Sequence, residues 1–340
     1  MSAKVGIVGA TGAVGEELLA VMEQRRFAVR ELLPMASERS AGRVVRFHGV
    51  DHPVRPLDVA ALAECDVVFL SAGATLSRTL APQLLRGRPR LYDNTSAFRL
   101  DPAVPLVVPE VNAHRLTPSH RHAAVANCTA ILLVLALAPL ERAFGLERVI
   151  VSTYQSVSGA GRRALERLRD ELARELRGET LPAGGPPPFA FNCLPSIGEL
   201  DPSGSVAART TGEEQKVAAE ARRILERPDL AVTATCVRVP VLRAHSESVF
   251  VELRDRAASL DAVIAALRAA PGVTLKDDAA RGVLPTPRTA AGGDGIEVGR
   301  VRPGDRPGSF CFFLAGDQLR KGAALTAVQL AELQLPHAGA

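Results

Sequence analysis

The chain of 340 residues has no tryptophan and only two tyrosines, so it offers little aromatic surface on which nucleic-acid bases could stack. Its formal net charge of +4 is small for this length, and its basic residues are scattered among acidic ones, as in Glu166–Arg177. A nucleic-acid-binding protein usually gathers positive charge on one face or stripe. These features argue against nucleic acid as a partner.

Long apolar runs are missing as well. The longest, Ala123–Leu140, is interrupted by Asn127 and Pro139, whereas a membrane-spanning helix needs about 20 apolar residues in succession. We therefore expect a buried core helix here and no membrane association. Because a strand is predicted from Lys4 onward, we also expect no signal peptide.

Cysteine pairs with the spacing of redox or metal sites are absent. The five cysteines form an odd number without a CxxC pair or a Cys/His cluster. We therefore expect no metal and a reducing, cytoplasmic location. Burial in apolar or β-rich runs is sufficient to explain four of them, which are Cys65, Cys193, Cys236 and Cys311.

The first part of the chain alternates between strand and helix patterns. The predicted strands are Lys4–Val8, Arg30–Met35, Asp66–Ser71, Leu91–Asp93 and Leu106–Val108, and the predicted helices are Ala13–Gln24 and Leu76–Leu85. Strands that alternate with helices predict an α/β fold with a Rossmann-type, doubly wound parallel sheet.

The pattern changes after Cys128. Helices are predicted over Ile131–Phe144, Arg162–Arg177, Gly212–Glu226 and Leu319–Leu335, and strands over Arg148–Ser156, Val232–Val239 and Ser246–Leu253. Strands that alternate with a period of two are typical of a mainly antiparallel, half-buried sheet. We expect a nucleotide-binding domain of residues 1–127 plus 319–340 and an α+β domain of residues 128–318.

A glycine-rich loop, GATGAVG, connects the first strand to the first helix. Gly9, Gly12 and Gly15 allow a tight turn and a close approach of the main chain to a pyrophosphate at the start of a helix. Thr11, Ala13 and Val14 lie between them. The spacing is GxxGxxG and not GxGxxG, so a tight turn without a ligand is the alternative interpretation. Its place between the first strand and an amphipathic helix favours dinucleotide binding.

The end of the second strand favours NADP over NAD. An NAD site usually places an acid there, on the ribose 2′-hydroxyl. This chain has Arg39 with Ser37 and Ser40 close by, and a guanidinium with flanking hydroxyls suits a 2′-phosphate. Glu38 is the argument for NAD.

Cys128 is the cysteine that lies at a predicted helix start. It follows Asn127 directly, and the N-terminus of a helix favours the thiolate form. A thiolate nucleophile needs a partner that can accept and return a proton. His245 is the best candidate, because it lies where one predicted strand passes to the next.

Several charged residues have patterns that suggest anion binding. Arg99 ends a polar stretch after a strand, and Arg238 lies within an apolar strand, where an unpaired charge would be costly. Glu213 and Lys216 are three residues apart on one helix, so they share a face. Spacing alone favours a surface ion pair for these two.

Taken together, these motifs resemble the aspartate-β-semialdehyde dehydrogenase family. The matching segments are GATGAVG (9–15), SAGA (71–74), DNTSAFR (93–99), VPEVN (108–112), NC (127–128), YQSVSGAG (154–161), EEQK (213–216), CVRVPVLRAHSES (236–248) and GDQLRKGAAL (316–325). They run in the family's order from one end of the chain to the other, and as an ordered set they are specific.

The resemblance implies NADPH-dependent reductive dephosphorylation of L-aspartyl-4-phosphate to L-aspartate 4-semialdehyde and phosphate, through a cysteine thioester. This step leads to lysine (by way of diaminopimelate), threonine and methionine. The resemblance also implies a homodimer formed by the second domain. An N-acetyl-γ-glutamyl-phosphate reductase and a catalytically silent NADP-binding paralogue are the alternatives.

The resemblance also assigns roles to individual residues. The catalytic residues would be Cys128 as nucleophile, His245 as general acid and base, and Gln155 as the group that orients the substrate. Arg238 would bind the substrate carboxylate and Arg99 and Lys216 its phosphate, supported by Asn127 and Glu213. The cofactor would be lined by Thr11–Val14, Arg39, Ser40, Ser158, Gly159 and Gln318. The chain departs from the family pattern at Ala126, Thr129 and Thr326, and none of these departures removes a reacting group.

Overall fold

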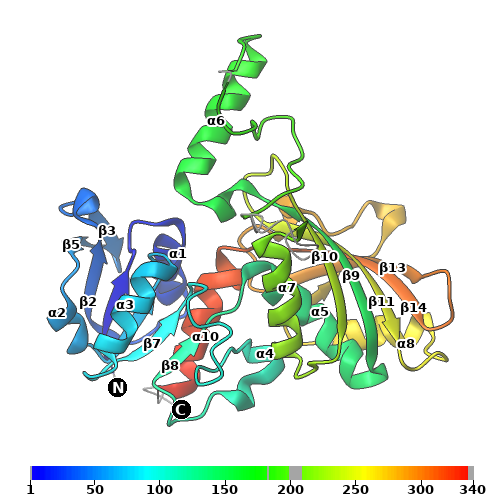
Figure 1. Cartoon of the computed structure of the whole chain (residues 1–340), viewed down its shortest axis with the longest axis horizontal. Coiled ribbons are helices and arrows are strands. Elements are labelled where there is room, and N and C mark those ends of the chain that lie inside the picture. The colour runs from blue at the N-terminus through cyan, green and yellow to red at the C-terminus, as the bar shows by residue number, and fades with distance from the viewer. Residues whose placement is uncertain (1, 182–183, 199–208, 336–340) are drawn as a thin grey trace. The chain divides into compact units, whose positions relative to one another are not determined.

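The structure is a computed structural model that describes residues 2–181, 184–198 and 209–335 (Figure 1). The described chain forms two compact units. Unit 1 comprises residues 2–127 and 322–335, and unit 2 comprises the described residues between 128 and 321. The division of the chain into two units does not test the roles expected of them, so cofactor binding by the first domain and catalysis by the second stay predictions.

Unit 1 is built around a six-stranded sheet with the strand order β5-β2-β1-β6-β7-β8. Its elements are β1 (Ala3–Val8), α1 (Ala13–Gln24), β2 (Val29–Ala36), β3 (Val44–Phe47), β4 (Val50–Pro53), β5 (Arg55–Pro56), α2 (Val59–Ala63), β6 (Val67–Leu70), α3 (Ala74–Leu84), β7 (Arg90–Asp93), α4 (Pro109–Asn112), β8 (His122–Ala124) and α10 (Leu325–Gln334). Each neighbouring pair in this sheet is parallel. The chain builds outward from β1 to one side and then to the other, which confirms the doubly wound fold.

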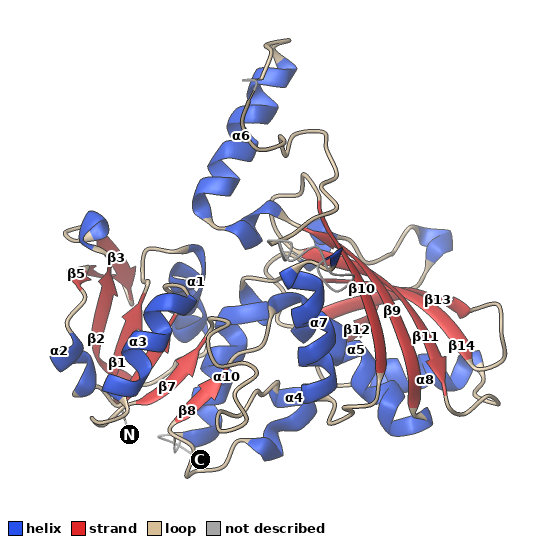
Figure 2. Cartoon of the chain, in the orientation of Figure 1, coloured by secondary structure: helices blue, strands red, loops and turns tan. Residues whose placement is uncertain are grey.

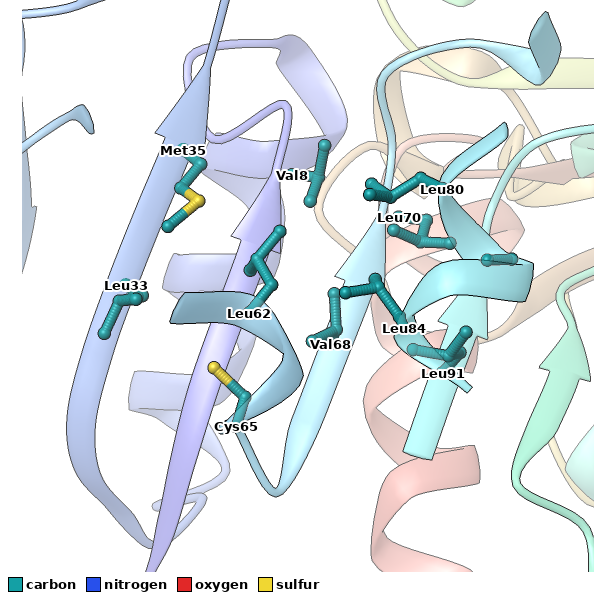
Figure 3. Packing of buried hydrophobic residues seen from close by; sticks show 11 residues of the cluster. Val8, Leu33, Met35, Leu62, Cys65, Val68, Leu70, Leu80, Leu84 and Leu91 are labelled. Atoms are coloured by element: carbon teal, nitrogen blue, oxygen red, sulfur yellow. The ribbon is translucent and has the colours of Figure 1, made fainter. Parts of the chain in front are cut away.

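The core of unit 1 lies where α2 and α3 pack on the sheet (Figure 3). Leu62 of α2 and Leu80 and Leu84 of α3 pack with the side chains of the strands, among them Val68 and Met35. Strands of parallel sheets are buried on both faces and therefore read as continuous apolar runs. Each leucine-sized side chain buried in this way stabilises the unit by about 1.5–3 kcal/mol.

The C-terminal helix α10 belongs to unit 1. Tyr92 of β7 donates a hydrogen bond from its hydroxyl to Gln334 Oε1 at 2.9 Å. Arg25 binds Glu332 through Nε and Nη2, at 2.8 and 2.6 Å. The predicted single helix over Leu319–Leu335 was wrong in detail, because the chain first forms a π-helical turn, Arg320–Ala324, and α10 begins after it.

The predicted strand Leu106–Val108 was also wrong. Only Leu106 makes a bridge, to Ala124, and α4 begins at Pro109. Proline is favoured in the first turn of a helix, where its missing N–H leaves no intrahelical bond unmade. The apolar run before it therefore leads into a helix instead of extending the sheet.

Unit 2 contains a second six-stranded sheet with the order β10-β9-β11-β14-β13-β12. Its elements are α5 (Cys128–Phe144), β9 (Leu146–Gln155), α6 (Arg162–Leu176), α7 (Gly212–Ile224), β10 (Ala231–Arg238), β11 (His245–Leu253), α8 (Leu260–Ala269), β12 (Val273–Leu275), α9 (Pro287–Ala290), β13 (Ile296–Pro303) and β14 (Ser309–Gly316). The three central pairs are antiparallel, and the two edge strands pair in parallel. The mainly antiparallel sheet is thereby confirmed.

The two faces of this sheet differ. The helices α5, α7 and α8 pack against one face, and α5 is buried along nearly its whole length (Figure 2). On β9, Thr153 and Gln155 are buried, whereas Tyr154 between them is 38% exposed and lies 6.0 Å from the ring of Phe313. Polar side chains on the helix-covered face are thus withdrawn from bulk water.

Candidate active site

The glycine loop of unit 1 is formed by main-chain contacts that leave no space for side chains at two positions. Gly9 has a φ of +92°, in the region that favours glycine. A Cβ on Gly15 would lie 2.3 Å from Gly9 O and 2.7 Å from Ala10 Cα. These glycines let the start of α1 approach the end of β1 closely, which is the geometry of a dinucleotide-binding turn.

The residues expected at the adenosine end of a dinucleotide follow β2. A short 3-10 turn, Glu38–Ser40, is closed by a hydrogen bond from Ser40 N to Ser37 O at 2.8 Å. The side chains of Ser37, Glu38 and Arg39 are exposed. The turn presents a guanidinium and hydroxyl groups together.

Arg99 and Asn127 belong to unit 1 and are buried. Arg99 donates from Nε to Val125 O and from Nη2 to Asn94 O, each at 2.9 Å. Asn94 follows β7 and Val125 follows β8, so two strand ends hold one guanidinium. Asn127 is the last residue of unit 1 and joins Cys128 through a peptide bond.

Unit 2 brings Cys128 and His245 together. Cys128 lies at the helix start, as predicted, although α5 begins at Cys128 itself and not at the expected Ile131, and Cys128 Sγ lies 3.5 Å from His245 Nε2. Gly316 explains why they meet: it pairs with His245 across β14 and β11, and a Cβ there would lie 2.6 Å from Leu132 of α5. Because Leu132 is one helical turn beyond Cys128, this close packing places the helix start at the start of β11.

The other cysteines differ from Cys128. Burial raises the pKa of the Cys65 thiol to about 11 and that of Cys236 to about 12, so both stay protonated at neutral pH. Cys311 is half-buried. The expectation of burial was wrong for Cys193, which is exposed, because it lies in a loop rather than in a strand.

His245 has no solvent-exposed surface. Burial, and then the positive charge of Arg238, hold the pKa of its imidazole well below the usual 6.5. The ring is therefore neutral at physiological pH. A neutral imidazole beside a sulfur can exchange a proton with a reacting group at that point.

Arg238 and Gln155 lie side by side, because β10 and β9 pair at these two residues. Arg238 is buried and donates from Nη1 to Ser156 O at 2.7 Å. Burial lowers the pKa of its guanidinium, and the nearby Cys128 and Glu213 oppose this shift. A buried cation beside a thiol is suited to bind an anionic group near the reacting sulfur.

The ion pair of Glu213 with Lys216 that the spacing predicts is present, but the prediction that it lies at the surface was wrong for Glu213, which is buried. Its side chain is 10% exposed, and its Oε2 lies 3.6 Å from Lys216 Nζ. Gln155 donates from Nε2 to Glu213 Oε1 at 3.4 Å. Glu213 of α7 thus contacts Gln155 on the buried face of the sheet and also the more exposed ammonium of Lys216.

The residues that the resemblance assigned to the cofactor from unit 2 pack around His245. Gln318 donates from Nε2 to Ser158 Oγ at 2.5 Å. A Cβ on Gly159 would lie 3.1 Å from His245 Cε1 and 3.2 Å from Arg238 Nη1. Gly159 therefore allows the main chain to pass close to both side chains.

Two residues of this region were missed in the sequence, although both lie within matched motifs. The main-chain N–H of Ser156 donates to His245 Nδ1 at 3.0 Å. Glu247 is fully buried two residues after His245. The signal for Ser156 was its place directly after Gln155, but a role that rests on a main-chain N–H is invisible in the residue type.

Neither a metal cluster nor a membrane span appears in the described parts of the chain. Residues 2–181, 184–198 and 209–335 contain no group of three or more His, Cys, Asp or Glu side chains arranged to hold a metal ion. Over the same ranges, no helix is long and apolar enough to cross a membrane.

Two family models match the chain. Residues 4–119 match "Semialdehyde dehydrogenase, NAD binding domain", and residues 137–321 match "Semialdehyde dehydrogenase, dimerisation domain". The first match shows a nicotinamide dinucleotide-binding domain, and the second covers most of unit 2.

Individual relatives match over nearly the whole length. An aspartate-semialdehyde dehydrogenase of Bacillus subtilis is 40% identical over 337 residues, which cover 96% of each chain. The crystal structure of aspartate semialdehyde dehydrogenase II from Vibrio cholerae is 38% identical, covers 98% of both chains and superimposes with a TM-score of 0.91. A structure of the Vibrio enzyme complexed with ASA superimposes with a TM-score of 0.90.

Proposed function

This chain belongs to the aspartate-semialdehyde dehydrogenase family, and we propose that it makes L-aspartate 4-semialdehyde from L-aspartyl-4-phosphate through a thioester on Cys128. The observation that carries the proposal is the 3.5 Å contact between Cys128 Sγ, at the start of α5, and His245 Nε2. We take ASA in the Vibrio complex to be aspartate semialdehyde, the product of this reaction. The product would feed the synthesis of lysine, through diaminopimelate, and of threonine and methionine.

The first step is acyl transfer to Cys128. The thiolate sulfur attacks the acyl carbon, the bond to the phosphate oxygen breaks, and phosphate leaves with the electron pair. Main-chain N–H groups at the start of α5 would stabilise the oxyanion that forms during this attack. The product on the enzyme is a thioester.

The second step is reduction of the thioester. A bound nicotinamide supplies the hydride. The Nε2–H of His245 would donate a hydrogen bond to the oxyanion that forms, and as the C–S bond breaks its electron pair returns to the sulfur and the aldehyde leaves. Because burial keeps the ring neutral, Nε2 would keep its proton through both events and no imidazolate would form.

The substrate would be held at its two charged ends. We assign the carboxylate to Arg238, whose buried guanidinium lies near the sulfur, and the phosphate to Arg99 and Lys216. Gln155 would orient the acyl group, with Glu213 holding the Gln155 amide. Asn127 would support the start of α5. Cations at both ends of a dianionic substrate would fix its carbonyl against the nucleophile.

The dinucleotide would bind to unit 1 through the loop from Gly9 to Gly15, lined by Thr11, Gly12, Ala13 and Val14. The loop fits such a ligand because its close main-chain packing excludes side chains at the glycines. Ser158, Gly159 and Gln318 would line the cofactor from the catalytic domain. In functional terms, residues 1–127 plus 319–340 would form the NADP-binding domain and residues 128–318 the catalytic and dimerisation domain.

We assign NADP as the preferred cofactor. The exposed Arg39, with Ser37 and Ser40, presents donors suited to a 2′-phosphate. Arg39→Ala should raise the KM for NADPH by about tenfold or more and leave that for NADH within about twofold. Steady-state kinetics with both cofactors measures this, and equal losses would contradict the assignment.

A homodimer would form through the open face of the unit 2 sheet. That face carries Ile150, Tyr154, Phe250 and Phe313 opposite the helix-covered side, and such apolar surface favours a protein partner. The family model for residues 137–321 describes a dimerisation domain. Sedimentation equilibrium should give a dimer mass for the wild type and a lower mass for Tyr154→Glu.

Because the mechanism needs a free thiolate, we place the enzyme in the reducing cytoplasm.

The direct test is phosphate-dependent reduction of NADP by the purified protein given aspartate semialdehyde, followed by nicotinamide absorbance. We expect turnover that disappears when phosphate is omitted. If the protein instead oxidises N-acetylglutamate semialdehyde, it is a reductase of the longer substrate. If it binds NADP but oxidises neither aldehyde, it is a silent paralogue.

A further inference from the structure

A chain of hydrogen bonds within unit 2 runs from the main chain of Ala244 to the ring of His245. The peptide bond between these two residues closes it into a ring. Ala244 N donates to Gln318 Oε1 at 2.8 Å, and Gln318 Nε2 donates to Ser158 Oγ at 2.5 Å. Ser158 Oγ lies 3.2 Å from Ser156 Oγ, which lies 3.1 Å from His245 Nδ1. All members of the ring are at most 4% exposed.

The donors of this ring point in one direction. Ala244 N–H can only donate, so it fixes the Gln318 amide with Oε1 toward Ala244 and Nε2 toward Ser158. Ser158 accepts from that amide and can donate to Ser156, which can donate to Nδ1. The main-chain N–H of Ser156 also donates to Nδ1, at 3.0 Å. Nδ1 is therefore an acceptor without a proton of its own.

The ring also holds the strained residue before the imidazole. Ala244 has a φ of +71°, in the left-handed region that non-glycine residues adopt only at a cost of about 1 kcal/mol or more. Its N–H is held by Gln318, and β11 begins at the next residue. The Gln318 amide thus fixes the main chain that carries His245, in addition to its role at Ser158.

We propose that Gln318 and Ser158 are positioning residues for His245, which through Ser156 keep Nδ1 an acceptor so that Nε2 carries the proton toward Cys128. A neutral imidazole with an acceptor at one nitrogen carries its proton on the other. Nε2–H faces Cys128 Sγ at 3.5 Å. This deepens the proposed function, because a neutral ring that donates a hydrogen bond to the oxygen above the thioester must bear its proton on this nitrogen.

The charged groups around the ring favour the same state. Arg238, on β10, disfavours a second proton on the imidazole, and Cys128 lies at the start of α5 on the Nε2 side. Glu247 follows on β11, and burial raises the pKa of its carboxyl well above the usual range, which opposes a negative charge there. Protonation of Nδ1 would place two hydrogens face to face, on Nδ1 and on Ser156 N, and would open the ring.

The test combines ring ¹⁵N NMR of histidine-labelled full-length enzyme with kinetics. The His245 signals are identified by their loss in His245→Asn. In the wild type we expect a protonated-type shift for Nε2 and an unprotonated-type shift for Nδ1.

Ser158→Ala breaks the ring at its centre. Gln318→Glu keeps the acceptor for Ala244 but, as a carboxylate, cannot donate to Ser158. Ser246→Ala is the matched control, because it is equally buried and adjacent to His245 but outside the ring.

In Ser158→Ala and Gln318→Glu we expect mixed ring tautomers, an about tenfold lower kcat, and an acidic limb of the pH profile moved to higher pH. Both residues are also assigned to the cofactor, so the ring signals and the pH limb, and not the KM for NADP, test the positioning role. A raised KM for NADP with unchanged ring signals and an unchanged pH limb would overturn the proposal and leave cofactor binding as their role. A protonated Nδ1 in the wild type would also overturn it. Because the ring signals need no substrate, a wild type inactive on aspartate semialdehyde would contradict the proposed reaction without affecting this test.

Discussion

The glycine loop of unit 1 and the helix-covered face of the unit 2 sheet, called the polar face below, are built in different ways. The loop consists of consecutive residues between Gly9 and Gly15, and its shape is set by main-chain contacts. The polar face takes Cys128 from α5, Gln155 from β9, and His245 from β11, 117 residues after the cysteine. A site of consecutive main-chain groups can be identified from local spacing, whereas a site of side chains from separate elements depends on strand register.

Register is what makes the unit 2 face possible. Arg238 and Gln155 meet because β10 and β9 pair at these residues, and His245 meets α5 because its partner Gly316 packs on Leu132. A slip of one residue would turn each of these side chains to the opposite face of the sheet. The two regions should therefore fail separately when each is altered.

Removal of the nucleophile is the strongest expected break. Cys128→Ala deletes the sulfur but leaves the glycine loop untouched, so kcat should fall by at least about 1000-fold. NADP affinity should stay within about twofold of the wild type, because no loop contact changes. Stopped-flow hydride transfer and NADP titration by calorimetry measure the two quantities. Residual thioester formation in the variant, detected by intact-mass spectrometry, would place the nucleophile elsewhere.

A substitution in the glycine loop should have the opposite effect and impair NADP binding instead of the chemistry at Cys128. A Cβ at Gly15 would lie 2.3 Å from a main-chain oxygen that cannot move aside cheaply, whereas at Gly12 the nearest atom is 3.3 Å away. Gly15→Ala should cost about 1–3 kcal/mol of unfolding free energy and weaken NADP binding by about tenfold or more.

Gly12→Ala is the matched control for stability in the same loop. Its melting temperature should lie closer to the wild type than that of Gly15→Ala. In both variants the acylation of Cys128 by substrate, measured as a single-turnover phosphate burst, should persist. Equal melting temperatures for the two variants would show that the loop relaxes around either methyl group.

A smaller effect is expected where unit 2 also uses a glycine. A methyl group at Gly159 would press on His245 and Arg238, with contacts of 3.1 and 3.2 Å. Gly159→Ala should lower kcat by about tenfold through displaced side chains, with little change in melting temperature. Gly185→Ala is the control, because nothing lies within 4 Å of a Cβ there. If only the KM for NADP rose in Gly159→Ala, the glycine would serve the cofactor and not the catalytic pair.

The central part of unit 1 could be predicted well, because its strands β1, β2, β6 and β7 and its helices α1 and α3 show clear patterns, whereas the shorter elements β3, β4, β5, β8, α2 and α4 were not identified. The helix α1 begins and ends at the predicted residues, Ala13 and Gln24. In unit 2, β13 and β14 were not identified, although β14 provides Gly316 opposite His245. Short apolar runs in a mixed sheet carry weak periodicity, and their partners are distant in sequence.

Cys128 could be identified because a helix start is a local signal, and His245 because it lies at the start of a strand. The contribution of Ser156 could not be found in this way, because it acts through a main-chain N–H. The left-handed backbone of Ala244 could not be found either, since alanine gives no sign of a positive φ. Both features arise only when β9 and β11 are brought together.

The smallest expected effect on turnover concerns Glu247, and it separates the two regions by their response to pH. The glycine loop is made of main-chain groups that do not titrate. Glu247 is fully buried on β11, where it lies opposite Thr153 of β9 and near the thiol of Cys236. Burial holds the pKa of its carboxyl well above the ordinary 4.5.

The sign of the pH dependence follows from this direction. A carboxyl whose folded pKa is raised contributes stability that is fully present below its unfolded pKa, about 4.3, and is lost as pH rises through the folded pKa. Glu247→Gln keeps the shape without an ionisable group, so it should not suffer this loss. The melting temperature of Glu247→Gln minus that of the wild type should therefore increase from pH 4.5 upward, with kcat at neutral pH within about twofold.

Differential scanning fluorimetry across this range measures the difference, with Glu252→Gln, at a half-buried position of the same strand, as control. A difference that is flat with pH would mean that Glu247 is ionised in the folded protein and paired there, and the polar face of unit 2 would then hold a second charge beside Arg238.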